Sequence, residues 1–144
     1  MSWAMASVAA QLGLLIYFQL HEWIHLPRWN DDLSGNSQGR LDVVLGVIQV
    51  GIIVGVGAES IVAMTLGVVV YAAWLGLQVI GWWIPYLRGA SDAHSRFYEK
   101  HWARTWRFLP PIGDHPVPNA AHVGLQVLIV ASLASTGGAL IGSA

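Results

Sequence analysis

The chain has 144 residues, of which 55% are hydrophobic and 10% are charged, and its formal net charge is −1. Because about a quarter of the residues in soluble domains are charged, this composition indicates one membrane domain over residues 1–144. The small net charge gives no basis for nucleic acid as a partner. The absence of cysteine excludes disulfides, iron–sulfur clusters and thiolate zinc sites.

Four apolar segments are each close to the ~20 residues that a helix needs to cross a bilayer. They cover about residues 2–26, 41–56, 60–84 and 119–141. Pro27 and Pro85 are expected to end the first and third segments, because proline cannot continue a helix. A very short turn at Gly57–Glu59 joins the second and third segments, and Asn119 is expected to cap the fourth. We therefore predict an all-α, polytopic membrane four-helix bundle whose outer surface contacts the lipid bilayer.

The seven Lys and Arg residues all fall in the two longer polar loops. They are Arg28 and Arg40 after the first segment, and Arg88, Arg96, Lys100, Arg104 and Arg107 after the third. Short loops rich in Lys and Arg stay on the cytoplasmic side of a membrane. This distribution predicts that both basic loops are cytoplasmic and that both termini lie outside, together with the Gly57–Glu59 turn.

The second segment contains a G-x-x-x-G pattern formed by Gly51 and Gly55. Small residues at this spacing let two helix backbones approach closely in lipid. Two interpretations remain open. The pattern serves packing within the bundle, or it serves contact with another chain, in a homo-oligomer or with other membrane subunits.

The loop between the third and fourth segments is predicted to contain an amphipathic helix over about residues 91–109, with Ser91 or Asp92 as its cap. Aromatic residues recur there at helical spacing beside a cationic stripe. The aromatic residues are Tyr98, Trp102 and Trp106, followed by Leu109, and the cations are Arg96, Lys100 and Arg104, followed by Arg107. An aromatic face beside a cationic face is typical of a helix that lies in the membrane interface. Such a helix anchors the bundle; alternatively it forms a lid over a cavity or a platform for an acidic partner.

The predicted topology places all six histidines near the cytoplasmic face. They are His21, His25, His94, His101, His115 and His122. Imidazole is the commonest metal ligand in proteins and titrates near neutral pH. The simplest interpretation is that these are ordinary interfacial histidines, but their common depth makes them candidate ligands.

The first segment ends in a literal zincin motif, His21-Glu22-Trp23-Ile24-His25. On a helix the two imidazoles would share one face and bind zinc, with Glu22 as the general base that activates a metal-bound water. The third ligand would come from Asp114 or from a later histidine, namely His94, His101, His115 or His122. Iron is a second candidate, as haem held between His122 and either His21 or His25.

Several short motifs in the C-terminal part of the chain resemble a family of small bacterial four-span membrane proteins. They are Trp82–Tyr86, Gly89–Ser91, Arg107–Pro110, Asp114–Asn119 and His122. The resemblance implies a four-span topology in the bacterial inner membrane. No activity is established for that family, so the resemblance implies no mechanism, and the zincin motif lies outside it.

These patterns favour a non-enzymatic protein that acts by binding, as an accessory component of a membrane assembly or as a homo-oligomer. Its working surface would combine the Asp114-His115-Pro116 loop, the interfacial helix and the cytoplasmic end of the first segment. The alternative is a metal or haem carrier, or a zinc hydrolase, built on His21, Glu22 and His25.

Overall fold

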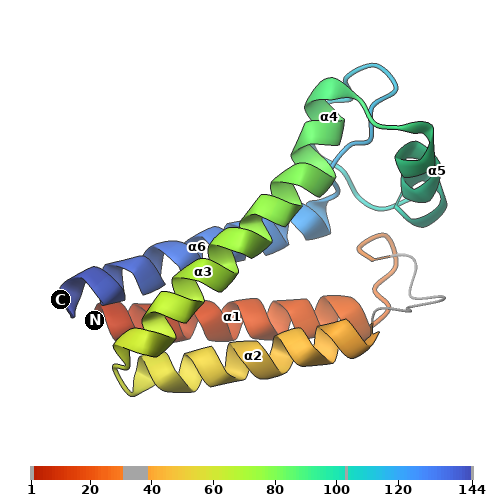
Figure 1. Ribbon diagram of the computed structural model, residues 1–144. Coiled ribbons are helices and arrows are strands. Elements are labelled where there is room, and N and C mark those ends of the chain that lie inside the picture. The colour runs from red at the N-terminus through yellow and green to blue at the C-terminus, as the bar shows by residue number, and fades with distance from the viewer. Residues whose placement is uncertain (1, 31–38, 103, 144) are drawn as a thin grey trace.

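A computed structural model describes residues 2–30, 39–102 and 104–143 of the chain (Figure 1). Every regular element in these ranges is helical, so the all-α prediction is confirmed. The elements are α1 (Trp3–Trp23), α2 (Gly39–Gly57), α3 (Ile61–Gln78), the π-helical segment η1 (Val79–Trp83), α4 (Ile84–Arg88), α5 (Asp92–His101) and α6 (Ala120–Gly142).

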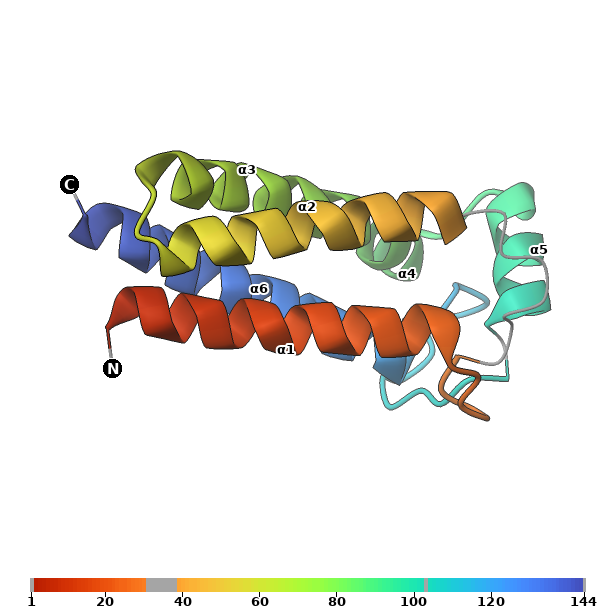
Figure 2. The same cartoon turned by 90° about the horizontal axis from the view of Figure 1, so that it is seen from below.

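Helices α1, α2, α3 and α6 form an up-and-down bundle (Figures 1 and 2). Helix α6 packs against α1 and α3, and α2 packs against the other sides of the same two helices. The side chains enclosed between them are mainly apolar: Leu14, Phe18, Ile52, Val56, Met64, Tyr71, Leu125 and Ile129. The two termini and the α2–α3 turn lie at one end of the bundle, while α4, α5 and the long loops lie at the other (Figure 2).

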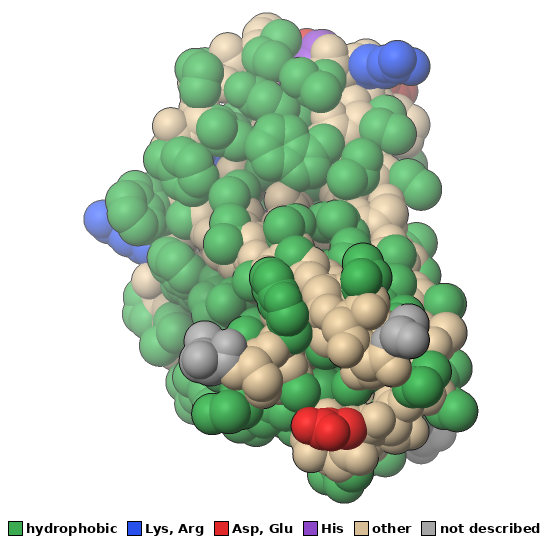
Figure 3. All heavy atoms as spheres, turned by 90° about the vertical axis from the view of Figure 1, so that its left-hand side faces the viewer, with side chains coloured by type: hydrophobic (Ala, Val, Ile, Leu, Met, Phe, Trp, Pro, Cys, Tyr) green, Lys and Arg blue, Asp and Glu red, His purple; other side chains and the backbone are tan. Residues whose placement is uncertain are grey.

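Three helical stretches in the described part of the chain are long and apolar enough to cross a membrane, namely Trp3–Trp23, Ile61–Arg88 and Ala120–Gly142. The apolar part of α2, Leu41–Gly57, is shorter. Seen from the end that carries the termini, the molecule is covered mostly by hydrophobic side chains (Figure 3). Such a surface is stable in contact with lipid, and the chain is therefore described as an integral membrane protein.

A cluster of polar side chains connects three helices inside the bundle. Gln11 of α1 donates from Nε2 to Ser7 Oγ (2.7 Å) and to Thr136 Oγ1 of α6 (3.0 Å). The hydroxyl of Tyr71 on α3 donates to Gln11 Oε1 at 3.0 Å. Because these groups satisfy one another away from water, they hold the register of α1, α3 and α6.

The first helix ends earlier than predicted, and Asn30 is the reason. Helix α1 stops at Trp23, whereas the sequence predicted helix as far as residue 26 with Pro27 as the terminator. The buried Asn30 amide (1% exposed) donates to the carbonyl oxygens of His21 and Ile24 and accepts from the backbone N–H of Leu26. One side chain therefore satisfies backbone groups on both sides of the turn, and the helix ends there.

The third span continues further than predicted and passes through Pro85. The N–H of Ile84 donates to the carbonyl oxygen of Val79, five residues earlier, which is the bonding pattern of a π-helix. Pro85 then occupies the first turn of α4, where the missing proline N–H has little cost. The helical path therefore runs from Ile61 to Arg88, and the prediction that Pro85 ends it is wrong.

The two glycines of the G-x-x-x-G pattern have different surroundings. A Cβ added at Gly55 would lie 2.3 Å from the Cβ of Ala63, so Gly55 allows α2 and α3 to approach closely beside their turn. A Cβ added at Gly51 would meet no atom within 4 Å, and Gly51 is exposed. Packing within the bundle thus explains Gly55, while contact of Gly51 with another chain stays a prediction.

Alanine at these two positions provides a matched test of helix packing. We expect Gly55→Ala to lower the free energy of unfolding by about 1–3 kcal/mol, because its methyl group cannot fit beside Ala63 without a backbone shift. Gly51→Ala adds the same group to an open surface and should be neutral, or stabilising by up to about 1 kcal/mol through helix propensity. Reversible unfolding in mixed micelles measures both values. An equal loss in both variants would show that Gly51 is also packed, against a second copy of the chain.

Candidate functional site at the histidine end of the bundle

Helix α5 is shorter than the predicted amphipathic helix. It covers Asp92–His101, and Ser91 caps it by accepting from the N–H of His94 at 3.3 Å. After α5 the chain turns back to the bundle, since the N–H of Trp106 donates to the carbonyl oxygen of Arg28 at 2.7 Å. The aromatic residues predicted to form one stripe over residues 91–109 are therefore not on one helix.

As a consequence, some of the aromatic residues of this segment pack inside the protein and others lie on its surface. Tyr98 is 6% exposed and its hydroxyl donates to the carbonyl oxygen of Val117 at 2.8 Å. Trp102 is half-buried against α6, whereas Trp106 is exposed and packs on Trp29. The cations predicted to meet lipid phosphates are exposed, namely Arg96, Lys100 and Arg104. Their contact with lipid stays a prediction.

Asn119 caps α6, as the sequence predicted, and it also fixes the state of His122. Its Oδ1 accepts from the backbone N–H of His122 (2.9 Å) and lies 2.8 Å from Nδ1 of the same residue. Its Nδ2 donates to the hydroxyl of Thr105 at 3.0 Å, so Oδ1 is the acceptor. In neutral His122 the proton is therefore on Nδ1, which leaves Nε2 with the lone pair.

His21 and His122 are the two histidines that the fold brings together. The buried positions of α1 follow a four-three spacing that places His21 in line with the core: Ser7, Gln11, Leu14, Phe18 and His21. The ring centroids of His21 and His122 are 5.2 Å apart with the planes at 81°. His21 is only 3% exposed, and neither of its ring nitrogens has a hydrogen-bond partner among the described residues.

The aromatic rings of Trp82, Trp102 and Tyr17 surround this histidine pair. The Trp82 ring of η1 lies 3.9 Å from that of His122, tilted by 38°. The Trp102 ring lies 4.7 Å from His122 and 6.2 Å from His21, edge to face with both. Tyr17 packs against His21 at 6.3 Å and donates from its hydroxyl to the carbonyl oxygen of Ala121. The pair therefore lies in an aromatic enclosure at the boundary between the bundle and its loops.

The other candidate ligands lie elsewhere. His25 is exposed and follows the end of α1, so it does not share a helical face with His21. Glu22 and His94 are half-buried on α1 and α5, and His101 packs against Phe97 with ring centroids 4.5 Å apart. Within residues 2–30, 39–102 and 104–143 no three His, Asp or Glu side chains converge on a point that could hold a metal. The zinc and haem assignments made from sequence stay predictions.

His115 closes the end of the third span. Its Nδ1 lies 2.9 Å from the carbonyl oxygen of Tyr86, which is one of the free carbonyls at the end of α4, so the imidazole N–H donates to it. The ring lies over Gly89, where an added Cβ would come within 3.3 Å of Nε2, and Gly89 has the positive φ of 87° that glycine tolerates. The hydroxyl of Tyr86 donates to the carbonyl oxygen of Pro110, so the loop is attached to α4 at two points.

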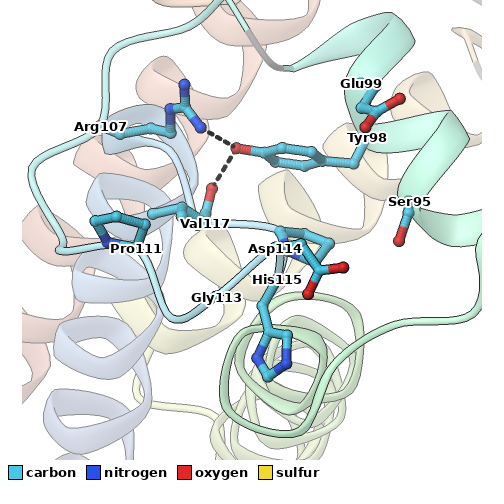
Figure 4. A pocket seen from close by; sticks show the side chains of 10 residues that line it. Ser95, Tyr98, Glu99, Arg107, Pro111, Gly113, Asp114, His115 and Val117 are labelled. Atoms are coloured by element: carbon cyan, nitrogen blue, oxygen red, sulfur yellow. Dashed lines mark hydrogen bonds between the residues drawn. The ribbon is translucent and has the colours of Figure 1, made fainter.

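A polar pocket of about 290 Å³ lies between α5 and the loop that precedes α6 (Figure 4). Its wall carries charges of both signs, Arg107 on one side and the carboxylates of Glu99 and Asp114 on the other, with Ser95 and His115 beside them. Arg107 donates from Nη1 to the hydroxyl of Tyr98 at 3.3 Å. The sequence predicted that the Asp114–Pro116 loop and the interfacial helix over about residues 91–109 belong to one working surface, but it did not single out Glu99 or Ser95 on that helix. Ser95 lies three and four residues before Tyr98 and Glu99, and this helical spacing was the available signal.

The residues that carry the family resemblance meet at this end, where Gly89 contacts His115 and Asn119 caps the helix that contains His122. Comparison with models of known protein families, with curated proteins and with solved structures finds no match. The interpretation of function therefore rests on the geometry of the histidine pair and of the pocket.

Asn119→Ala tests whether this one side chain holds the loops to the bundle. The variant loses the helix cap, leaves the buried Thr105 hydroxyl without the donor that it accepts from, and leaves the Nδ1–H of His122 without its acceptor. We therefore expect a loss of about 2–4 kcal/mol of unfolding free energy. Ser91→Ala is the matched control, because it removes an exposed cap and should cost about 1 kcal/mol or less. Unfolding in micelles, followed by tryptophan fluorescence, separates the two. Similar losses in both variants would contradict the central role of Asn119.

Proposed function

We propose that the chain is a non-enzymatic integral membrane protein that binds a zwitterionic group, an ammonium joined to a phosphate, in the pocket between α5 and the loop before α6. The observation that carries this proposal is the presence of opposite charges on the pocket wall, with Arg107 on one side and Glu99 and Asp114 on the other. A purely anionic ligand would be repelled by the two carboxylates, and a purely cationic one by Arg107. A ligand with both charges complements both sides.

The place of the pocket favours the headgroup of an aminophospholipid as the source of that zwitterion. His115 lines the pocket and also bonds to Tyr86, near the end of the apolar stretch Ile61–Arg88. The pocket thus lies where a span leaves the membrane, which is the depth of lipid headgroups. The surrounding excess of Lys and Arg favours the cytoplasmic leaflet, with the termini and the α2–α3 turn outside. In this arrangement α2 is the fourth crossing, because it runs beside α1 over most of its length (Figure 2).

Hydrogen bonds within the protein hold part of the pocket wall in place. The Tyr98 hydroxyl bridges Val117 and Arg107, and His115 is bonded to α4. A preformed wall spares the ligand the cost of ordering loops. A volume of about 290 Å³ is at the small end of ligand pockets, which suits a headgroup with its acyl chains left in the bilayer. Binding of this kind would suit an accessory component of a membrane assembly, alone or as a homo-oligomer.

Asp114→Asn tests the proposal, with Glu59→Gln as the matched control at the opposite end of the bundle. The chain would be purified in micelles with equal amounts of phosphatidylethanolamine, phosphatidylcholine and phosphatidylglycerol, and the retained lipid counted by mass spectrometry. We expect enrichment of phosphatidylethanolamine, because its ammonium can donate hydrogen bonds to carboxylates and the choline group cannot. Asp114→Asn should reduce that enrichment several-fold, roughly the value of one charge-assisted hydrogen bond, and Glu59→Gln should leave it unchanged.

A test with soluble phosphoethanolamine distinguishes a lipid headgroup from a free zwitterion as the ligand of the pocket. Thermal stabilisation by the soluble compound, together with no lipid enrichment, would assign the pocket to a free zwitterion. Absence of both effects, or an equal effect of the two substitutions, would refute the proposed function.

A further inference from the structure

We propose that the groove between α1 and α2 holds an acyl chain of a membrane phospholipid, and that the Gln19 amide donates a hydrogen bond to the ester carbonyl of that chain. The groove has a volume of about 400 Å³. It is lined by Leu15 and Gln19 of α1 and by Val43, Gly46, Val47 and Val50 of α2. None of these described residues lines the polar pocket, so the inference is independent of the proposed function.

The groove opens on the surface that the bundle presents to lipid. Its rim on α2 consists of Val43, Val47 and Val50, which are exposed, and its floor is Gly46, which is buried. From Val43 to Val50 it follows α2 for about 10 Å, which is most of the ~15 Å of hydrocarbon in one leaflet. A second helix packs closely where small residues form the rim. Three branched side chains around one glycine leave room for a single hydrocarbon chain instead.

Gln19 brings one polar group into this apolar groove. Its Oε1 accepts from the indole Nε1 of Trp23 at 2.9 Å. Because an indole nitrogen can only donate, this bond fixes which end of the amide is the oxygen. Nε2 therefore lies towards α2, where a Cβ added at Gly46 would come within 2.9 Å of it. The glycine thus leaves the amide N–H groups open to the groove.

The open amide requires an acceptor. Among residues 2–30, 39–102 and 104–143, the bond from Trp23 is the one hydrogen bond of the Gln19 side chain, and no described group accepts from Nε2. Hydrocarbon tails cannot replace the hydrogen bonds that an amide makes with water, so an unpaired N–H in a lipid-facing groove is costly. A ligand that carries an acceptor beside an apolar chain removes this cost.

The ester carbonyl of a phospholipid is the acceptor available at this depth. Gln19 is one helical turn, about 6 Å, inside Trp23, which is exposed at the end of α1. Exposed tryptophans are enriched at the boundary between hydrocarbon and headgroups. The apolar part of α2, Leu41–Gly57, spans only about 25 Å, and a bilayer of ~30 Å thins beside so short a helix. Thinning brings the ester groups towards Gln19.

Ester-linked and ether-linked phosphatidylcholine test the hydrogen bond, since the ether form can have the same headgroup and chains without the carbonyl oxygen. The full chain would be purified in micelles with equal amounts of the two lipids, and the retained lipid counted by mass spectrometry. We expect the ester-linked lipid to be enriched roughly 2- to 10-fold, the value of one neutral hydrogen bond. The headgroup is constant, so this ratio is separate from any headgroup preference of the polar pocket.

Two matched pairs of variants locate the effect. Gln19→Leu removes the donor and should bring the ratio close to one. Gln78→Leu makes the same change on α3, where the side chain accepts from Gln126, and should keep the wild-type ratio. Gly46→Val fills the floor of the groove and should lower the retention of both lipids several-fold, whereas Gly51→Val adds the same group to open space and should not.

The wild-type ratio needs no variant, so the test holds even if a substitution unfolds the protein. Equal retention of the two lipids by the wild type, or an ester preference that folded Gln19→Leu keeps, would overturn the proposal. Undiminished lipid retention in folded Gly46→Val would overturn the groove as its location. A dimer in micelles that Gly46→Val dissociates would assign the groove to a second copy of the chain instead.

Discussion

The side-chain amide of Asn119 is the interaction on which the histidine end of the molecule depends. With no exposed surface of its own, it caps α6, binds Thr105 of the preceding loop and orients His122. A helix that begins at a membrane boundary has backbone N–H groups that neither lipid nor loose water can satisfy well. The Oδ1 of Asn119 accepts from one of these N–H groups, and its Nδ2 donates to Thr105 and so attaches the preceding loop. The same side chain therefore caps α6 and orients His122 in the candidate site.

The histidine pair and the polar pocket are separate, but the same short segment, from Tyr98 to Trp102, contributes a side chain to each. Tyr98, at the end of α5, lines the pocket and is bonded to Val117 and Arg107. Trp102, one helical turn later, lies against His21 and His122. The return of the chain to Arg28 at Trp106 holds this turn against the bundle. The segment predicted to lie in the membrane interface is thus also packed on the protein, which explains why Tyr98 is buried and Trp102 is half-buried.

Hydropathy and spacing were sufficient to locate the four helices of the bundle, because each contains an apolar stretch of nearly the length that a membrane requires. The cap at Asn119 was also readable, since it depends on residues next to each other in sequence. The positions of the helix ends could not be predicted from the sequence. Helix α1 stops where Asn30 folds back onto His21, and the third span continues because a π-helical segment accommodates Pro85. The pairing of His21 with His122, and the exclusion of His25 from it, follow from those ends, so sequence could only name these histidines as alternatives.

The polar side chains at this end are mostly used by the backbone, and what is left over identifies the groups available to a ligand. Asn30 and His115 satisfy carbonyl oxygens after α1 and α4, and Asn119 satisfies the first turn of α6. Each of these groups is required by helix ends that must be closed near lipid. Among the groups that no helix end requires are the buried ring nitrogens of His21 and the exposed carboxylates of Glu99 and Asp114. The two carboxylates lie on the wall of one pocket, where their like charges repel each other, and a bound ammonium group would offset that repulsion.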